Sequence, residues 1–472
     1  MNIPRPAFWL LILAALVLLH GCTVKSGRVP AEPGKALPAN YAEATEAAAG
    51  GRPEIGRWWE RFADARLNNM VTETLAHNLD LVQAQARLAR FEAEARLTEA
   101  DRGPFLNLAM QAGRERQIGT AGFGPATGSN YRLSLAAGYE LDLWRKLKQQ
   151  SVAAGFDVLA SREDVKTLYL SLTAQVVDLY YFAVEQRAQM AMTETIIASF
   201  ADTLARVEDR YAAGQAPALD VYQARQNLAA ARTRLPVFEA NLATARHALA
   251  ILAGRFPTRE LSGELATLPP APAAFPAGLP SELLARRPDI KAAMLRVKAG
   301  DARVAAALAA RFPAFNLLGS YGLARIDLGS VVSGTFWSLL AEVTQAVWDG
   351  GRRQAEVERR AALLREGMGK YQQTVLGAFQ EVEDALSNNR TTERLLVLQD
   401  EHLAATEADL ALATEGYFSG LNDYLAVLTA QRRNLEARGQ LLSTKRRLIA
   451  DRISLLRALG GDWLTAAGGS AE

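Results

Sequence analysis

The sequence contains the same apolar heptad series twice, 207 residues apart, and this duplication constrains the fold more than any other feature. The first series is Val221, Leu228, Leu235, Leu242 and Leu249, and the second is Leu428, Leu435, Leu442, Ile449 and Leu456. Gly254 and Gly461 follow the two series at the same offset. An apolar residue at every seventh position predicts long helices that pack along a continuous seam.

A second group of residues repeats at an offset of 209. The pairs are Asp80/Asp289, Arg87/Arg296, Ala93/Ala302, Arg102/Arg311, Pro104/Pro313, Asn107/Asn316, Leu108/Leu317 and Gly113/Gly322. Because both groups recur in the same order, we expect two structurally similar halves, residues 58–267 and 281–462. A Pro-rich linker at 268–280 joins them, and a short tail, 463–472, follows the second half.

Each half contains two segments in which apolar and polar residues alternate. We predict strands at 105–117 and 130–143 in the first half, and at 315–325 and 336–348 in the second. One face is polar, with Arg132, Ser134, Glu140, Asp142, Asn316, Ser320 and Glu342. The other face is apolar and includes Tyr131, Tyr139, Tyr321 and Trp337. This pattern fits strands that separate lipid from a water-filled lumen, although a soluble β-sandwich face alternates in the same way.

Four strands cannot close a membrane barrel. An open sheet in lipid leaves edge amides unpaired, at a cost of several kcal/mol for each group. The chain is therefore expected to share a barrel with other copies of itself. Two copies would supply eight strands and three would supply twelve, and strand physics alone does not choose between them.

Long helices surround the strands. The periodicity predicts helices at 67–101, at 148–212 with a turn at Gly214, and at 219–252 with a kink at Pro236. The second half is expected to run from 353 to 418, to turn at Gly420 and to return from 421 to 459. A 65-residue helix would reach roughly 100 Å at ~1.5 Å per residue. The fold class is therefore mainly α with a membrane β-barrel.

The N-terminus is predicted to be a processing and anchoring segment. Residues 1–21 have a basic start and an apolar run at 7–19, which is typical of a signal peptide. Leu19-His20-Gly21-Cys22 resembles a bacterial lipobox, with His20 an unusual occupant. We expect Cys22, the only cysteine, to carry a covalent N-terminal lipid, and residues 22–57 to form a tether. The alternative is an ordinary signal peptide with a buried thiol.

The most specific sequence signals are at the turns. Tyr211-Ala-Ala-Gly214 and Tyr417-Phe-Ser-Gly420 each open a turn into an Ala/Gln-rich helix, a Gly-Leu-Asn-Asp-Tyr-Leu run covers 420–425, and Asp349-Gly350-Gly351-Arg352 leaves the last strand. With the duplication, these residues resemble the TolC/OprM family of outer-membrane efflux ducts, in its OprM/NodT-like lipoprotein branch. Leu143-Trp144-Arg145-Lys146 lacks the glycine that the family usually carries at the first-half exit, which puts the local bend in doubt.

The resemblance implies a homotrimer with a shared 12-stranded barrel in outer-membrane lipid and an α-helical periplasmic tunnel. It also implies a periplasmic adaptor, an inner-membrane efflux pump, and passive transport of drugs, toxic compounds or metal ions. The candidate gate residues are Leu421, Asn422, Asp423 and Leu425, and the candidate adaptor-docking residues are Tyr211, Gly214, Tyr417 and Gly420. Each is equally interpretable as a helix cap, turn or packing residue.

No sequence pattern indicates catalysis, a metal site or a cofactor other than the lipid. His77, His247 and His402 are isolated, and Glu163–Asp164 and Glu383–Asp384 are interpreted as solvated helix faces. A net charge of +2 offers no argument for nucleic acid. Two alternatives to the duct remain. One is a lipid-anchored periplasmic coiled-coil scaffold protein, and the other is a secreted lipoprotein enzyme.

Overall fold

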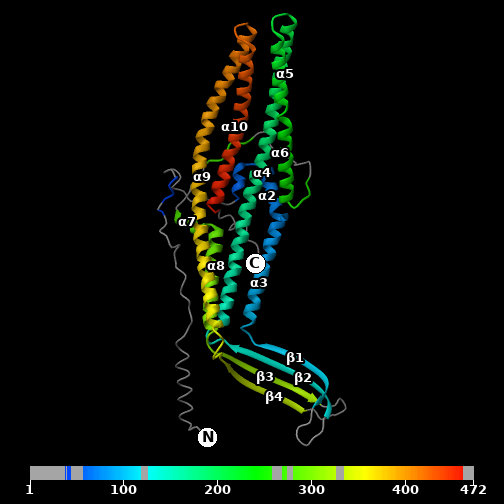
Figure 1. Cartoon of the computed structure of the whole chain (residues 1–472), viewed down its shortest axis with the longest axis vertical. Helices are drawn as coiled ribbons and strands as arrows, with labels where there is room; N and C mark the ends of the chain where they lie inside the picture. The colour runs from blue at the N-terminus through cyan, green and yellow to red at the C-terminus, as the bar shows by residue number, and fades with distance from the viewer. Residues whose placement is uncertain are drawn as a thin grey trace. The chain divides into compact units, whose positions relative to one another are not determined.

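A computed structural model of the chain (Figure 1) describes residues 38, 40–43, 57–117, 126–257, 268–273, 280–325 and 334–460. Cys22, Gly461 and the predicted signal peptide lie outside these residues. The described chain is mostly helical and contains one four-stranded sheet. None of its described helices is both long and apolar enough to cross a bilayer.

The chain divides into two compact units, and each unit takes corresponding stretches from both halves of the sequence. Unit 1 contains Arg87–Arg162 and Ala292–Gln372. Unit 2 contains Lys35–Ala86, Glu163–Lys291 and Gln373–Glu472. The sequence duplication therefore appears inside each unit as a pair of related segments.

The outgoing helices of the two halves match in length. Helices α3 (Leu79–Ala100) and α8 (Pro288–Ala309) have 22 residues each. Helices α4 (Lys146–Ala212) and α9 (Arg352–Phe418) have 67 residues each. Of the ten heptad residues, the buried ones are Val221, Leu228, Leu242, Leu249, Leu435, Ile449 and Leu456. The seam predicted from the sequence is therefore part of the core of unit 2.

The returning helices differ. The second half returns in one helix, α10 (Tyr424–Ala458), whereas the first half returns in two, α5 (Ala218–Arg232) and α6 (Leu235–Leu252). We expected a kink within one helix at Pro236, but the structure breaks the helix. Proline lacks an N–H and its ring collides with the carbonyl four residues earlier, so Pro236 lies in the first turn of α6 instead.

The helix predicted at 67–101 is also divided. A 3-10 helix, η2 (Trp58–Phe62), precedes α2 (Ala65–His77), and α3 begins after Asn78. The buried Asn78 side chain accepts hydrogen bonds from the N–H groups of Asp80 (2.9 Å) and Leu81 (3.1 Å) and donates to the carbonyl of Leu252 (2.9 Å). An asparagine that caps a helix start in this way ends the preceding helix. A short helix, α7 (Pro280–Arg286), precedes α8.

The sheet consists of β1 (Phe105–Gln117), β2 (Ala126–Leu141), β3 (Ala314–Arg325) and β4 (Gly334–Thr344). The strands lie in the order β1-β2-β3-β4 and all neighbours are antiparallel (Figure 1). Strands β1 and β4 are thus the two edges of the sheet within one chain.

The strand register keeps the predicted apolar and polar faces continuous across the sheet. Directly opposed residues point to the same side of an antiparallel sheet. One row contains Leu108, Leu135, Tyr321 and Trp337, and the next row contains Asn107, Ala136, Ser320 and Ser338. The polar positions that share the second face are Arg132, Ser134, Glu140, Asn316, Ser320 and Glu342.

The predicted strands 130–143 and 336–348 extend past the observed ends of β2 and β4, at Leu141 and Thr344. Asp142 follows the end of β2, and its carboxylate accepts hydrogen bonds from the N–H groups of Leu147 (3.1 Å) and Lys148 (2.7 Å), in the first turn of α4. Val347 follows the end of β4 and is 96% exposed. The alternation of apolar and polar residues continues past both strand ends, so the alternation alone does not show where each strand stops.

The first-half exit bends without the glycine that we expected it to need. Arg145 itself adopts a left-handed φ of 62°, whereas the second exit uses Gly350 and Gly351 at 63° and 84°. The Trp144 indole stabilises this bend, since Nε1 donates to the carbonyl of Pro313 at 2.8 Å and the ring stacks on Phe312 at 4.8 Å.

A short N-terminal segment is attached to α9. Tyr41 is 4% exposed and its ring lies 6.0 Å from that of Phe379. The N–H groups of Ala42 and Glu43 donate to the two carboxylate oxygens of Glu383 at 2.7 and 2.9 Å. Glu383, interpreted as part of a solvated helix face, is half-buried, and its carboxylate accepts hydrogen bonds from these two backbone donors.

Candidate gate and channel surfaces

Helices α4 and α9 end in the same kind of turn. Gly214 and Gly420 adopt left-handed φ values of 71° and 79°. In each turn the glycine N–H bonds to the carbonyl three residues earlier, and the next N–H bonds five residues back, at 2.7 to 3.0 Å. This is a Schellman motif, which glycine favours because it has no Cβ to collide with the backbone.

The two tyrosines that precede these turns have different environments. Tyr211 is 50% exposed, whereas Tyr417 is 4% exposed. Within one chain the Tyr417 side chain is therefore part of the core. The predicted gate leucines, Leu421 and Leu425, are 82% and 56% exposed within one chain.

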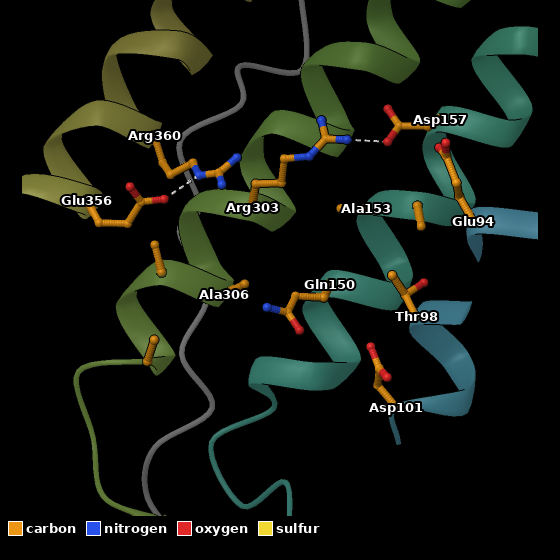
Figure 2. Close-up of a pocket in the computed structure, with 13 residues that line it drawn as sticks. Glu94, Thr98, Asp101, Gln150, Ala153, Asp157, Arg303, Ala306, Glu356 and Arg360 are labelled. Atoms are coloured by element: carbon orange, nitrogen blue, oxygen red, sulfur yellow. Dashed lines mark hydrogen bonds and ion pairs between the residues drawn. The ribbon is translucent and has the colours of Figure 1, made fainter. Parts of the chain in front are cut away.

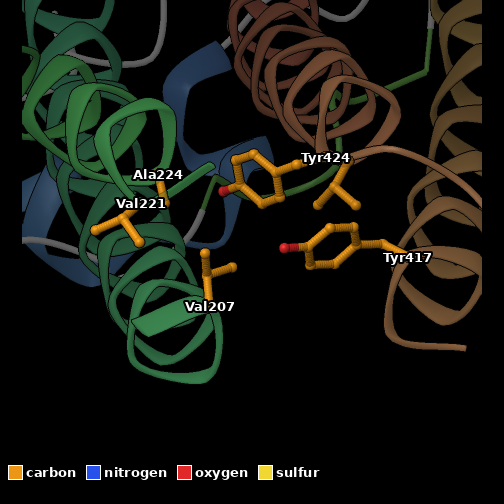
Figure 3. Packing of buried hydrophobic residues seen from close by; sticks show 6 residues of the cluster. Val207, Val221, Ala224, Tyr417 and Tyr424 are labelled. Atoms are coloured by element: carbon orange, nitrogen blue, oxygen red, sulfur yellow. The ribbon is translucent and has the colours of Figure 1, made fainter. Parts of the chain in front are cut away.

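Tyr417 belongs to a buried cluster between the two helical hairpins, which we call the gate cluster (Figure 3). Its members are Val207, Val221, Ala224, Tyr417, Tyr424 and Val427. The rings of Tyr417 and Tyr424 meet edge to face at 5.2 Å. The Tyr417 hydroxyl donates a 2.9 Å hydrogen bond to Oδ2 of Asp220, and both side chains are buried.

Burial keeps the two tyrosine hydroxyls of the gate cluster protonated to a higher pH than an exposed tyrosine. Desolvation, and then the hydrogen bond to Asp220, raise the pKa of Tyr417 far above its usual range. Desolvation raises the pKa of Tyr424 to about 12. Both hydroxyls therefore stay protonated at neutral pH, so that Tyr417 remains a donor to the Asp220 carboxylate.

Arginines from α4 hold the end of α9. Nη1 of Arg210 donates to the carbonyls of Tyr417 (3.1 Å) and Phe418 (2.8 Å). The guanidinium of Arg206 lies 3.6 Å from the centroid of the Phe418 ring. A cation suits this position because the last carbonyls of a helix lack intrahelical partners and carry the negative end of its dipole.

Asn422 and Asp423 both have structural roles in the second turn. Asp423 is the N-cap of α10, and its carboxylate accepts a 3.2 Å hydrogen bond from the N–H of Ala426. Asn422 packs on Gly416, where an added Cβ would lie 2.3 Å from the Asn422 amide nitrogen. These contacts account for both residues within one chain and leave their side chains available for a second role.

A groove follows the outgoing helix α9 in unit 2. It has a volume of about 690 Å³ and is lined by Arg206, Glu407, Leu410, Ala411, Thr414, Glu415, Phe418, Ser419 and Arg438. The lining combines positive and negative side chains with small and apolar ones. A partner helix with a polar surface can pair with such a lining.

In unit 1, four helices line one pocket of about 580 Å³ (Figure 2). An ion pair between Arg303 and Asp157 joins α8 to α4, and Nε of Arg360 contacts Glu356 on α9 at 2.7 Å. Burial raises the pKa of Asp157, which the Arg303 charge opposes. Residues of α3, α4, α8 and α9 all contribute to its lining.

The described residues contain no group of three or more His, Cys, Asp or Glu side chains placed to hold a metal ion. The described residues provide a two-faced sheet with unpaired edges, a pocket with charged lining residues, and two hairpins joined by hydrogen bonds near their turns.

Comparison with known proteins identifies the family. The model of the family described as outer membrane efflux protein matches residues 70–255 and 279–461. The chain belongs to this family. The two matched segments coincide closely with the two sequence halves, so the duplication is a property of the family's fold.

Relatives of this efflux protein match most of the chain. The probable efflux pump outer membrane protein SepC of Pseudomonas putida is 29% identical over 469 residues, covering 96% of each chain. The cation efflux system protein CusC of Escherichia coli is 29% identical over 408 residues, covering 86% of this chain and 88% of its own. Among solved structures, the outer-membrane channel OprN has a TM-score of 0.87 at 28% identity, covering 94% of this chain and 100% of that chain.

These findings confirm the predicted family, the efflux function and the outer-membrane location, with a large periplasmic helical part. They favour the channel over the scaffold and enzyme alternatives. They do not bear on individual gate, docking or lipidation residues.

Sequence reasoning did not find Asp220, Arg210 and Arg206, which hold the gate cluster of this efflux protein together. The available signal was weak. Arg210 lies in the last turn of α4 and Asp220 in the first turn of α5, where both charges also suit their own helix dipoles. Their contacts with α9 cross about 200 residues of sequence and become visible only in the folded chain.

Proposed function

We propose that three copies of this efflux protein form a passive duct, with a shared 12-stranded barrel and a helical tunnel, in a tripartite efflux system. The supporting observation is the sheet itself. Within the described chain no strand covers the outer edge of β1 or β4, although one face of the sheet carries an apolar band between Leu141 and Tyr131. In lipid each unpaired backbone group costs several kcal/mol, which closure among copies removes.

The experiment is extraction from outer membranes in mild detergent, followed by reconstitution in planar bilayers. The duct predicts a trimer that dissociates only on heating and a defined ion conductance. A stable monomer that leaves bilayers impermeable would contradict the proposal.

The gate cluster is proposed to hold the duct closed. Opening requires the α9–α10 hairpin to move relative to α4 and α5, which breaks the Tyr417–Asp220 hydrogen bond and withdraws Arg210 from the carbonyls at the end of α9. Such a shear of packed helices is a common form of conformational change.

Asp423 is proposed to act in the gate in addition to capping α10. Three copies around an axis would bring like charges together, where they repel or bind a cation. Asp423→Ala is expected to raise single-channel conductance. Asp423→Asn removes the charge but preserves the N-cap, because Asn caps as well as Asp. A change seen in Ala but not in Asn would assign the effect to capping, and unchanged conductance in both would reject the gating role.

A periplasmic adaptor and an inner-membrane pump are the proposed partners. The docking surface would include Tyr211, Gly214 and Gly420 and the groove along α9, with Tyr417 excluded by its burial. Photo-crosslinkers at position 211 should capture the adaptor, whereas crosslinkers at buried position 417 should not. Equal capture at both positions would reject this surface.

A lipid on Cys22 is proposed to anchor the N-terminus. The attachment of residues 41–43 to α9 supports a tether that contacts the helical part. Mass spectrometry of the mature N-terminal peptide should find diacylglyceryl and acyl groups on Cys22. An unmodified thiol would contradict the anchor.

A further inference from the structure

Arg114 and Arg116 interrupt the pattern on the apolar face of the sheet, beyond the row in which Arg325 lies opposite Tyr131. Arg114 and Arg116 lie on β1 opposite Ser129 and Thr127 of β2. Counting from Leu108 and Met110 in steps of two, both belong to the same face as those apolar residues. Both are exposed. Charged residues on a lipid-facing surface are costly at the bilayer centre and inexpensive only near its boundary.

The length of the apolar face places these arginines at that boundary. On β2 the apolar rows extend from Leu141 to Tyr131, ten residue-to-residue steps along the strand. Ten residues span roughly 33 Å along a strand, or roughly 25 Å across the membrane at a tilt of about 40°. This equals the apolar band of known membrane barrels, ~25 Å. Tyr131 ends the band with an aromatic ring, as interface residues commonly do.

Arg114 and Arg116 lie one and two rows beyond Tyr131. At two residues per row, they are about 5 and about 10 Å past the edge of the apolar band. That depth is the headgroup layer. A guanidinium there faces phosphate groups rather than acyl chains, and Arg binds phosphate through paired hydrogen bonds.

Neither guanidinium is neutralised within the described part of the chain. No carboxylate there forms an ion pair with Arg114 or Arg116, and their cross-strand neighbours are hydroxyl residues. Glu115, between the two arginines, is at a position on the opposite face of β1, and the sequence from 117 to 131 contains no Asp or Glu. The positive charge on this face is therefore available to an external anion.

We propose that Arg114 and Arg116 bind the phosphate groups of anionic lipid headgroups in the leaflet at the β1–β2 hairpin end of the barrel. This inference rests on the proposed function, since it requires the apolar face to contact lipid. The occupant is a lipid rather than a free anion because the same face continues directly into the apolar band. Three copies would present six guanidinium groups around the rim.

The test is lipid retention by the full-length protein in detergent, measured by native mass spectrometry. The probes are lipid A with both phosphates and the same lipid without them. The wild type is expected to retain the phosphorylated lipid, and Arg114→Gln/Arg116→Gln to retain it at least about ten-fold less. Dephosphorylated lipid should bind all variants weakly, and millimolar inorganic phosphate should not compete.

The matched control is Arg132→Gln. Arg132 is also an arginine on the sheet, opposite Gln111, but it lies on the polar face with its guanidinium 5.3 Å from the Phe336 ring. Its substitution should leave lipid retention unchanged. If Arg132→Gln loses as much lipid as the double variant, or if the double variant retains the wild-type amount, the proposal is overturned. Effective competition by inorganic phosphate would also overturn it, in favour of a free-anion site.

A second variant guards against misfolding. Arg114→Lys/Arg116→Lys keeps the charge but loses the paired hydrogen-bond geometry, so an intermediate loss of lipid retention is expected. Full loss of lipid retention in a trimeric, conducting protein would contradict a charge-based site.

Conductance of the same samples separates the two proposals. A wild type that retains phosphorylated lipid but conducts no ions rejects the duct alone, whereas a conducting wild type that retains none rejects the lipid site alone.

Discussion

The two helical hairpins come from a duplicated sequence, yet they are built differently. Both outgoing helices have 67 residues and both turns use a left-handed glycine. The first hairpin returns in two helices broken before Pro236, and α5 starts at Pro217 without a side-chain cap. The second returns in one 35-residue helix, capped by Asp423.

The two hairpins contribute different groups to the contact between them. The first hairpin supplies Arg210 and Asp220, and the second supplies the backbone carbonyls and the hydroxyl that these residues bind. The tyrosines at the two corresponding positions differ accordingly in burial, since Tyr211 is exposed and Tyr417 is buried. One hairpin therefore provides the contacts that hold the end of the other.

The largest expected effect comes from moving the helix break to the second hairpin. Ser443 occupies the position 207 residues after Pro236, in the interior of α10. Ser443→Pro should destabilise the protein by about 3 kcal/mol or more, because proline removes a helical hydrogen bond and collides with the preceding turn. Chemical unfolding measures this loss. Ser443→Ala is the control for the lost hydroxyl contact with Glu185. A proline variant as stable as the alanine variant would mean that the second hairpin tolerates the break too.

The next effect distinguishes the two tyrosines. Tyr417→Phe removes the donor to the buried Asp220 carboxylate and should cost about 2 kcal/mol, because a buried acceptor is left unpaired. Tyr211→Phe should cost almost nothing, since that side chain is half exposed. Unfolding free energies of both variants test this, and conductance should rise only for Tyr417→Phe. Equal effects at the two positions would remove the asymmetry that we infer.

A smaller effect concerns alkaline pH. Burial raises the pKa of Tyr424 from 10.0 to about 12 in the folded protein. The folded state thus holds this proton more tightly than the unfolded state, so its contribution is complete below pH 10 and is lost as the pH rises towards 12. Tyr424→Phe should flatten the decline measured by thermal unfolding across this window. An unchanged slope would show that Tyr424 does not carry it.

The smallest effect tests what the hairpins share. Gly214 and Gly420 have similar positive φ values and open space where a Cβ would lie. Gly214→Ala and Gly420→Ala should therefore each cost roughly 1 kcal/mol from backbone strain, with no added collision. Gly254→Ala is the contrasting control, because its Cβ would lie 2.4 Å from the carbonyl of His77 and should cost more. Unequal costs at Gly214 and Gly420 would mean that the turns differ beyond their backbone geometry.

Much of the architecture was predictable because its causes are local. Alternation with a period of two defined the faces of the strands, and the register then joined those faces without exception at the named rows. Glycines marked the turns because only they adopt a left-handed backbone at little cost. The prediction failed where local patterns are silent, as at Asn78, where a side chain bound to the carbonyl of Leu252 divides a helix.

The duplication, the long helices, the two-faced strands and the positions of the two turns follow from the sequence alone, since periodicity and backbone preference act within a few residues. Packing in the folded chain makes Tyr417 a core residue while Tyr211 stays half exposed, and it makes Asp142 cap a helix instead of facing the sheet. It also brings Arg210 and Asp220 to the second hairpin. Burial and hydrogen bonding between residues about 200 positions apart depend on this packing, which two similar sequence motifs do not encode locally.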